Sequence, residues 1–226
     1  IEQAMTSLRA AGCRRIVVLP LYPHYSSSTT ASIVDEIGRI LRGLQHQPTV
    51  NIVPPYFDHP QFIDLLARSV RRAFPHRLPD HILVSNHGIP ESMVRRGDPY
   101  SCQAKKTARL LQQTLGCNNQ QMSAAFQSRF GAAEWVKPYS VARVKQLAES
   151  GLSHLAVIAP SFAVDCLETL EEINIGLRED FIHHHPTTSP LAATAHRQPQ
   201  FYYIPCLNDE ADVIDFYHQL ILPYIS

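Results

Sequence analysis

The chain has 226 residues, of which 45% are hydrophobic and 18% charged, a size and composition that fit one or two globular domains. Lysine and arginine total 20, as do aspartate and glutamate, so no charge imbalance attracts nucleic acid, which we do not expect as a partner. No apolar run approaches the roughly 20 residues that cross a bilayer, and five cysteines without a C-x-x-C pair favour a reducing, cytoplasmic setting with at most a peripheral membrane contact.

Apolar runs rich in valine, isoleucine and leucine alternate with helical segments along the chain. Residues 1–11 predict a helix that ends at Gly12, and because residue 1 is not methionine, we expect the natural chain to begin upstream. Strands that alternate with helices of about 10 to 15 residues indicate a mostly parallel sheet with helices on both faces, which is an α/β fold. The expected strands are Arg15–Leu21, Val50–Pro54, His81–Ser85, Leu155–Ala159 and Phe201–Ile204.

One helix-glycine-strand unit recurs farther along the chain. A shift of 139 positions places Gly12 on Gly151 and residues 16–19 on residues 155–158. The repeat favours two similar α/β halves over one larger unit.

The C-terminal part of the chain contains a predicted loop and a predicted helix. Residues 183–200 are rich in histidine, proline, threonine and alanine without periodicity, which predicts a surface loop where the adjacent histidines 183–185 are solvated rather than bound to a metal. Residues 209–225 predict an amphipathic helix. Its apolar face consists of Val213, Phe216, Tyr217 and Leu220.

Three segments place polar and aromatic side chains directly after a predicted strand. They are residues 22–30, 86–90 and 162–168. Because ligands bind outside the carboxyl ends of the strands in open α/β sheets, we expect all three segments to border one cleft. The hydroxyl groups of residues 26–30 either cap the helix that follows or donate hydrogen bonds to a carboxylate or phosphate.

An acidic helix is predicted at the end of the third segment. On an α-helix, Asp165, Glu168 and Glu172 share one face. This pattern has two interpretations. In the first, Asp165 and Glu168 form a capping box at the start of the helix. In the second, the carboxylates line the cleft as metal ligands and proton acceptors. The opposite face, expected to be buried, contains Leu167, Leu170, Ile173 and Leu177.

His87 directly follows a predicted strand and precedes Gly88. Its imidazole is therefore expected at the carboxyl edge of the sheet, beside a flexible backbone position. A histidine in this place either packs as a structural residue or acts as a general base opposite the acidic helix.

Five segments together resemble motifs of the ferrochelatases and occur in the order of that family. The resemblance covers nearly the whole chain apart from residues 183–200, which look like an insertion. The segments are Leu-Tyr-Pro-His-Tyr-Ser with Ser-Thr-Thr (21–30), Ser-Asn-His-Gly-Ile-Pro (85–90) with Gly-Asp-Pro-Tyr (97–100), Phe-Gln-Ser-Arg-Phe-Gly (126–131) with Trp-Val-Lys-Pro-Tyr (135–139), Asp-Cys-Leu-Glu-Thr-Leu-Glu-Glu (165–172), and Tyr-Ile-Pro-Cys-Leu-Asn-Asp (203–209).

The resemblance implies an α/β architecture of two Rossmann-like (chelatase-like) domains, with parallel sheets flanked by helices and a porphyrin cleft between the domains. Residues 1–78 then form the remainder of the N-terminal domain, which is incomplete at its N-terminus. Residues 79–205 form the C-terminal domain that carries the catalytic histidine and glutamate. Residues 206–226 form a C-terminal helix that packs back on the first domain.

The resemblance also implies roles for individual residues. His87 and Glu168 match the catalytic pair on opposite sides of the macrocycle, and both are expected to contact the metal. Asp165, Glu171 and Glu172 match the acidic side along which metal or protons pass. Residues expected to bind the porphyrin are Tyr22, Tyr25, Ser26, Thr29, Trp135 and Phe162, although Trp135 also fits a core position.

The implied activity is that of a lyase that inserts Fe²⁺ into protoporphyrin IX, releases two protons and forms protohaem in the last step of haem biosynthesis. Ser27 stands where iron–sulfur members have a cysteine, and no cysteine cluster follows Cys206, so we expect no [2Fe–2S] cluster and no cofactor beyond substrate iron. The alternatives are a related cobalt or nickel tetrapyrrole chelatase, a coproporphyrin ferrochelatase and a non-catalytic porphyrin-binding fragment.

Overall fold

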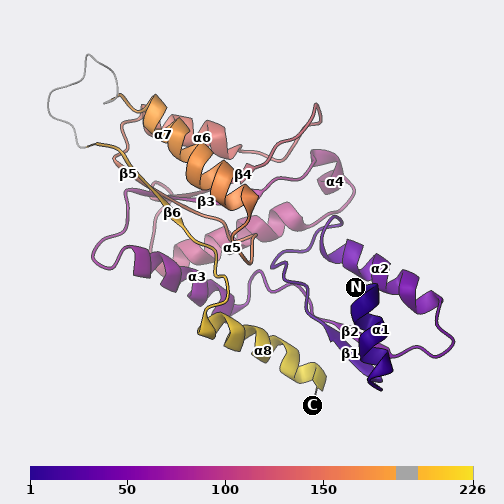
Figure 1. Ribbon diagram of the computed structural model, residues 1–226. Coiled ribbons are helices and arrows are strands. Elements are labelled where there is room, and N and C mark those ends of the chain that lie inside the picture. Colours follow the sequence, from indigo (N-terminus) through magenta and orange to yellow (C-terminus); the bar gives the residue numbers. More distant parts are fainter. Residues whose placement is uncertain (187–197, 226) are drawn as a thin grey trace.

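The computed structural model describes residues 1–186 and 198–225. Helices and strands alternate along these residues (Figure 1), as the α/β prediction requires. The elements are α1 (Glu2–Ala10), β1 (Arg15–Val18), α2 (Thr30–Arg42), β2 (Thr49–Ile52), α3 (Pro60–Ala73), β3 (His81–His87), α4 (Glu91–Arg95), α5 (Tyr100–Leu115), β4 (Met122–Gln127), α6 (Ser140–Glu149), β5 (His154–Ile158), the π-helix η1 (Glu168–Leu177), α7 (Arg178–His184), β6 (Gln200–Ile204) and α8 (Ala211–Ile225).

The strands form two separate sheets in which every pair is parallel. β1 pairs with β2, and the larger sheet has the order β4-β3-β5-β6. After β3 the chain moves to one side of that strand for β4 and then to its other side for β5. The segment after β3 therefore leads toward β4, and the segment after β5 leads in the opposite direction, toward β6. The place between these two neighbouring strands is the switch point where open α/β sheets bind ligands.

β4 is a strand that the sequence pattern did not predict. Its residues, Met-Ser-Ala-Ala-Phe-Gln, include no β-branched side chain. Its pairing with β3 extends from Ile82 to His87 on the β3 side, so tertiary contacts rather than local propensity stabilise it. The other five strands overlap the predicted runs.

Helices cover both faces of the larger sheet. Side chains alternate between the two faces along a strand, so Leu83 and Val84 of β3 point in opposite directions, and both are fully buried. Val84 belongs to a core shared with α3 and α5, whereas Leu83 packs with α6, η1 and α7. Figure 1 shows the same two layers on either side of β3, β5 and β6. Burial on both sides explains why β3 is a continuous apolar run rather than an alternating one.

The smaller sheet packs against α1 and α2. Met5 of α1 and Ile37 and Ile40 of α2 are buried beside the apolar side chains of β1 and β2. These elements lie together next to the N-terminus in Figure 1. They form a core of their own, separate from the two cores of the larger sheet.

The recurring helix-glycine-strand unit is present twice in the structure. Gly12 lies between α1 and β1, and Gly151 lies between α6 and β5. Their φ angles are +82° and +77°. A side chain with a Cβ atom is strained in this left-handed conformation, which explains why both junctions contain glycine.

The packing of α3 and α8 crosses the domain limits predicted from the sequence. α3 was expected within residues 1–78, yet it packs against α5 and β6 of the larger sheet. α8 was expected to pack on the first domain, and it contacts both α3 and β1. The division of the chain into domains at residue 78 stays a prediction.

The acidic segment forms a π-helix instead of the predicted α-helix, and this changes its buried face. A π-helix has i→i+5 hydrogen bonds and a wider turn, so side chains four positions apart align along η1. Thr169, Ile173 and Leu177 are buried, whereas Leu167 and Leu170 are 75% and 46% exposed. The prediction that Leu167 and Leu170 face the core was wrong. It used side chains three positions apart, which share a face on an α-helix but not on the wider π-helix.

The three adjacent histidines do not all lie in a solvated loop. His183 and His184 belong to the last turn of α7. His185 is only 4% exposed, and its ring lies 5.9 Å from the ring of Phe181. The expectation of solvation was wrong for His185, because α7 ends with this ring beside Phe181, which belongs to a core of the larger sheet. Most of the predicted loop, residues 187–197, lies outside the described residues.

The predicted amphipathic helix near the C-terminus is confirmed as α8, and its burial leads to a test. Phe216 is fully buried among the rings of Tyr56, Phe62 and Tyr217. We expect Phe216→Ala to lower the free energy of unfolding by about 3–5 kcal/mol in urea denaturation, because truncation leaves a cavity. Ile214→Ala, on the same helix at 51% exposure, is the matched control. Equal losses for the two variants would contradict the packing of α8 described here.

Candidate active site

Segments that follow β1, β3 and β5 meet around one cavity of about 390 Å³. β3 and β5 are neighbours at the switch point of the larger sheet, and the segment after β1 reaches the same place. The expectation that the three segments border one cleft is confirmed. The cavity is lined by Tyr22, His24, Ser26, Ser28, Thr29, His87, Ile89, Tyr100, Ser161, Phe162 and Glu168.

His87 ends β3, and a hydrogen bond defines which of its ring nitrogens is protonated. Nδ1 lies 2.6 Å from the carbonyl oxygen of Gly88. Because a carbonyl oxygen only accepts, Nδ1 carries the proton in the neutral ring and Nε2 presents a lone pair. The backbone N–H of His87 donates to Ser161 Oγ at 3.1 Å, which joins the end of β3 to the segment after β5.

Glu168 is the first residue of η1, and it lines the same cavity as His87. Its backbone carbonyl accepts a hydrogen bond of 2.9 Å from Gln127 Nε2 at the end of β4. Hydrogen bonds from the Cys166 side chain and from its own backbone N–H lower the pKa of the Glu168 carboxyl, with a further contribution from His87, against a small opposing effect of burial. The cavity therefore contains an ionised carboxylate together with an imidazole.

The five residues predicted to contact metal are only partly brought together. His87 and Glu168 line the cavity, whereas Asp165, Glu171 and Glu172 do not. Glu171 and Glu172 are exposed on the outer side of η1. Within residues 1–186 and 198–225, no group of three or more histidine, cysteine, aspartate or glutamate side chains is arranged to hold a metal ion.

Asp165 is not the helix cap that one interpretation predicted. The residue before η1 is Leu167, and no side chain caps this end of the helix. Both oxygens of the Asp165 carboxylate instead accept hydrogen bonds from β6 and from the segment between β6 and α8. The capping-box prediction was wrong because the wide turn of η1 begins three residues after Asp165.

The hydroxyl groups after β1 are held mainly by an aspartate from another part of the chain. Asp98 Oδ2 accepts from Ser26 Oγ at 2.9 Å, from Ser27 N at 2.7 Å and from Ser27 Oγ at 2.8 Å. Burial raises the pKa of Asp98, but these bonds and one from the backbone of Tyr100 outweigh it, so the net pKa is lowered. Thr29 precedes α2 without capping it through its side chain. Neither sequence interpretation included Asp98 as the partner.

The predicted porphyrin-binding residues divide into those that line the cavity and those that support it. Tyr22, at 42% exposure, and Phe162 are in the lining. Tyr25 is not, and its backbone N–H donates to Gln103 Oε1 on α5 at 2.7 Å. Ser26 is in the lining, although its hydroxyl is directed to Asp98.

Two aromatic rings flank His87. The ring centroids of Phe162 and Trp135 lie 6.2 Å and 6.5 Å from that of His87. A Cβ atom on Gly88 would lie 2.8 Å from the carbonyl oxygen of Gln127 and 3.1 Å from the Trp135 ring, so only glycine fits beside the histidine. Trp135 packs behind His87 and is not part of the cavity lining.

His24 is a site residue that the sequence analysis did not select. Thr107 Oγ1 donates to the carbonyl oxygen of Phe57 at 2.6 Å and lies 2.9 Å from His24 Nε2. The single hydroxyl proton of Thr107 is used on Phe57, so Nε2 is the donor to Thr107. Burial lowers the pKa of His24 to about 3, and the ring is neutral. The sequence signal that could have identified His24 is its position within the Leu-Tyr-Pro-His-Tyr-Ser motif after β1.

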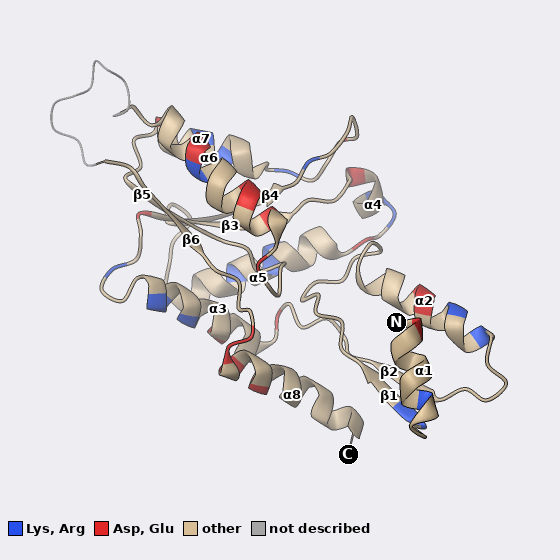
Figure 2. Ribbon diagram, viewed as in Figure 1, with Lys and Arg blue, Asp and Glu red and all other residues tan. Residues whose placement is uncertain are grey.

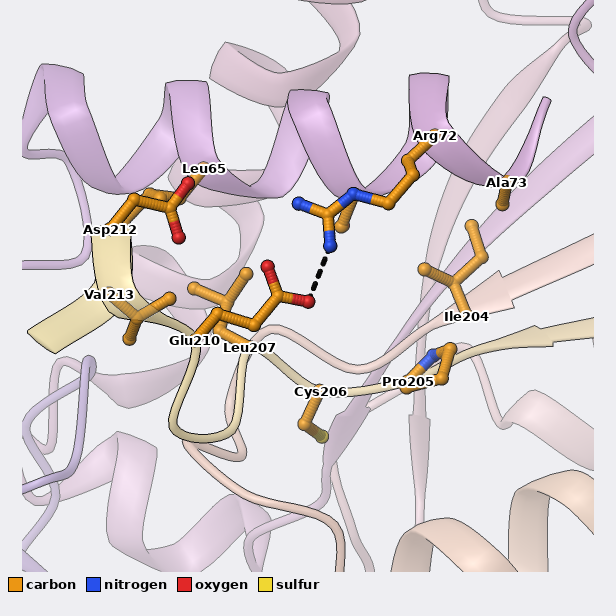
Figure 3. Close-up of a pocket in the computed structure, with 11 residues that line it drawn as sticks. Leu65, Arg72, Ala73, Ile204, Pro205, Cys206, Leu207, Glu210, Asp212 and Val213 are labelled. Carbon is orange, nitrogen blue, oxygen red and sulfur yellow. Dashed lines mark hydrogen bonds and ion pairs between the residues drawn. The ribbon is translucent and has the colours of Figure 1, made fainter. Parts of the chain in front are cut away.

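A second pocket, of about 250 Å³, lies between α3 and the segment that joins β6 to α8. Figure 3 shows Arg72 of α3 facing Glu210 across this pocket, and their ion pair has a distance of 2.5 Å. Asp212 of the same pocket pairs with Arg68. The acidic residues of η1 and α7 lie on the other side of the larger sheet (Figure 2). The charged side chains that line the second pocket, Arg72, Glu210 and Asp212, are thus all engaged in ion pairs.

The burial of His24 predicts a measurable dependence of stability on pH. The unfolded state binds a proton below the ordinary pKa of histidine, whereas folded His24 stays neutral to about pH 3, so this contribution to stability is lost as the pH falls through that window. Between pH 7 and pH 5, we expect His24→Gln to lose about 2 kcal/mol less unfolding free energy than the unmodified chain. Urea denaturation at both pH values measures this, with the exposed His46→Gln as control. Equal losses in all three proteins would contradict a buried neutral His24.

Comparisons with known proteins identify the family of the chain. A model of the ferrochelatase family matches residues 1–223. The ferrochelatase of Azoarcus sp. strain BH72 is 42% identical over 95% of this chain and 56% of its own length. Those of Rhodobacter capsulatus and Rhizobium meliloti strain 1021 are 43% and 44% identical over 92% and 94% of this chain, and 57% and 60% of their own lengths. The chain thus spans less than two thirds of these relatives.

A solved structure shares the fold. SirB from Bacillus subtilis with Fe³⁺ has a TM-score of 0.68 and 14% sequence identity, and the match covers 98% of this chain and 75% of that one. At this identity the likeness concerns the fold, and it agrees with the chelatase-like architecture expected from the sequence. Together with the family match over residues 1–223, these findings show that the chain belongs to the ferrochelatase family.

Proposed function

We propose that this protein inserts Fe²⁺ into protoporphyrin IX with release of two protons, and so forms protohaem in the last step of haem biosynthesis. Iron and the porphyrin are both substrates. Membership of the ferrochelatase family supports the class of reaction, and the cavity at the switch point supports its location.

The observation that carries the proposal is the pairing of a basic nitrogen with a carboxylate in one cavity. His87 Nε2 presents a lone pair because Nδ1 is engaged with Gly88. Glu168 lines the same cavity, and its pKa is lowered by hydrogen bonds from Cys166 and the backbone. Metal insertion needs both groups, because protons must leave the ring as a divalent cation approaches it.

In the proposed reaction, two pyrrole N–H bonds break and the ring nitrogens bind iron. His87 Nε2 accepts a proton from the ring and passes it to solvent, and the second proton leaves by the same route. The negative charge of Glu168 stabilises both the protonated imidazole and the incoming Fe²⁺. The atoms balance, because the products are the iron porphyrin and two protons.

The remaining predicted residues have proposed roles around this pair. Tyr22, Thr29 and Phe162 provide walls for the flat macrocycle, as aromatic and small polar side chains do in ligand pockets. Trp135 supports the His87 ring from behind. The two exposed carboxylates that follow Glu168 on η1, Glu171 and Glu172, attract the cation toward the cavity.

We also propose a cytoplasmic setting with at most a peripheral membrane contact, no nucleic acid partner, and no cofactor beyond substrate iron. Across residues 1–186 and 198–225, no helix combines the length and the apolar character needed to span a bilayer. Ser27 stands where a [2Fe–2S] ligand would be a cysteine.

The test is metal insertion followed by absorbance under anaerobic conditions, with protoporphyrin IX and Fe²⁺, Co²⁺ or Ni²⁺. Because the chain spans 56% of the Azoarcus relative, it is assayed alone and fused to the part of that relative left unmatched. We expect His87→Ala to lower kcat about 10²- to 10⁴-fold and Glu168→Gln to lower it about 10²-fold.

Glu179→Gln is the matched control, since it removes an exposed carboxylate on α7 away from the cavity. It is expected to keep full activity. Turnover that survives His87→Ala in the fused protein would sink the proposed mechanism. Binding of protoporphyrin without turnover in every form would instead favour a porphyrin carrier, and preference for Co²⁺ or Ni²⁺ would favour a related chelatase.

A further inference from the structure

We propose that Asp165 is a positioning residue, whose carboxylate fixes the start of η1 and thereby the place of Glu168 in the cavity. This inference rests on the proposed function, and it replaces the metal-binding role that the sequence suggested for Asp165. Three links carry it: the contacts of the carboxylate, their connection to Glu168, and the lack of a cap on η1.

The Asp165 carboxylate is surrounded by donors from β6 and from the segment that follows it. Oδ1 accepts from the hydroxyl of Tyr203 and from the backbone N–H of Cys206, the latter at 3.2 Å. Oδ2 accepts from Asn208 Nδ2 at 2.9 Å, and the Asn208 side chain also accepts from the backbone N–H of Asp165 at 2.9 Å. Burial raises the pKa of Asp165, but the donors outweigh it, so the net pKa is lowered.

These contacts continue to Thr169, the residue after Glu168. The hydroxyl of Thr169 lies 3.3 Å from Asp165 Oδ1 and accepts from the Cys166 N–H at 2.9 Å. Thr169 is fully buried. On the other side, Gln127 Nε2 holds the Glu168 carbonyl at 2.9 Å. The backbone of Glu168 is therefore held between the end of β4 and the Asp165 cluster.

The place where η1 begins depends on the segment that precedes it. No side chain caps η1, and the backbone N–H groups of Thr169 and Leu170 donate instead to the carbonyl oxygen of Cys166, the residue after Asp165, at 3.1 and 2.9 Å. Leu167, just before η1, and Leu170, in its first turn, are exposed, so apolar burial anchors this end weakly. A partly buried carboxylate with several donors is costly to disrupt, and it supplies the rigidity that catalytic side chains require.

The same contacts argue against a metal role for Asp165. Both oxygens are engaged by donors from the protein, and the residue does not line the cavity that contains Glu168. A metal ion at Asp165 would have to displace Tyr203 or Asn208.

The experiment compares Asp165→Asn, Tyr203→Phe and the control Glu179→Gln in the fused protein used to test the function. The side-chain amide of asparagine places N–H groups where the Asp165 carboxylate accepts from Tyr203, Cys206 and Asn208. We therefore expect Asp165→Asn to lower kcat about 10- to 100-fold. The KM for protoporphyrin IX is expected to change less than about twofold. Tyr203→Phe removes one donor, and we expect a loss of about three- to tenfold in kcat.

Hydrogen exchange followed by mass spectrometry gives a second readout that needs no turnover. In Asp165→Asn we expect faster exchange confined to residues 163–173, with unchanged exchange in β3 and β5. Wild-type kcat together with wild-type exchange in this variant would overturn the inference. So would faster exchange across the whole sheet, which marks a general loss of stability. If the unmodified protein does not insert metal, the proposed function fails, and the exchange experiment still decides whether Asp165 holds η1.

Discussion

β3 and β5 lie side by side while the segments that follow them diverge, and the site depends on this pairing. The register places Val84 beside Ile158, so both strands end at the same edge of the sheet. His87 leaves the sheet there from β3, and the segment after β5 returns to the same place at Glu168. A slip of one residue would turn every side chain of β3 to the opposite face and remove the His87 ring from the cavity. Parallel pairing thus brings together two groups that are far apart in the sequence.

The segment after β1, in the smaller sheet's part of the chain, reaches the cavity through polar contacts with Asp98, just before α5, and with the N-terminal half of α5. Asp98 binds two serines, Gln103 binds the backbone of Tyr25, and Thr107 binds His24. The last two partners lie one turn apart on α5 and share a face. Burying these polar groups is costly unless each finds a hydrogen-bonding partner. Because a hydrogen bond requires a defined direction, these contacts fix the position of the segment after β1 more narrowly than apolar packing does. Apolar cores build each sheet, and these hydrogen bonds join the segment after β1 to α5 and to the turn before it.

The α/β class and the convergence of the three segments could be predicted because both follow from local pattern and from the geometry of parallel sheets. Apolar runs identify strands that are buried on both faces, and His87 and Glu168 follow such runs. β4 escaped prediction because its small and polar residues are stabilised by pairing with β3. The acidic helix was assigned the wrong buried face because periodicity assumes an α-helix, whereas η1 is wider. Asp98 and His24 were not selected because their partners lie far away in the chain.

By itself the sequence determined the type of most elements, the glycines at the two helix-strand junctions and the two residues proposed for catalysis, since these depend on neighbouring residues and on motifs. Only the tertiary structure decided which carboxylates reach the cavity. Asp165 and Glu168 are three residues apart, yet Asp165 accepts hydrogen bonds from Cys206 and Asn208 after β6, whereas Glu168 lines the cavity together with His87. The physical reason is that the destination of a charged side chain depends on where its hydrogen-bonding partners lie in space. Local pattern contains no information about partners contributed by distant strands and loops.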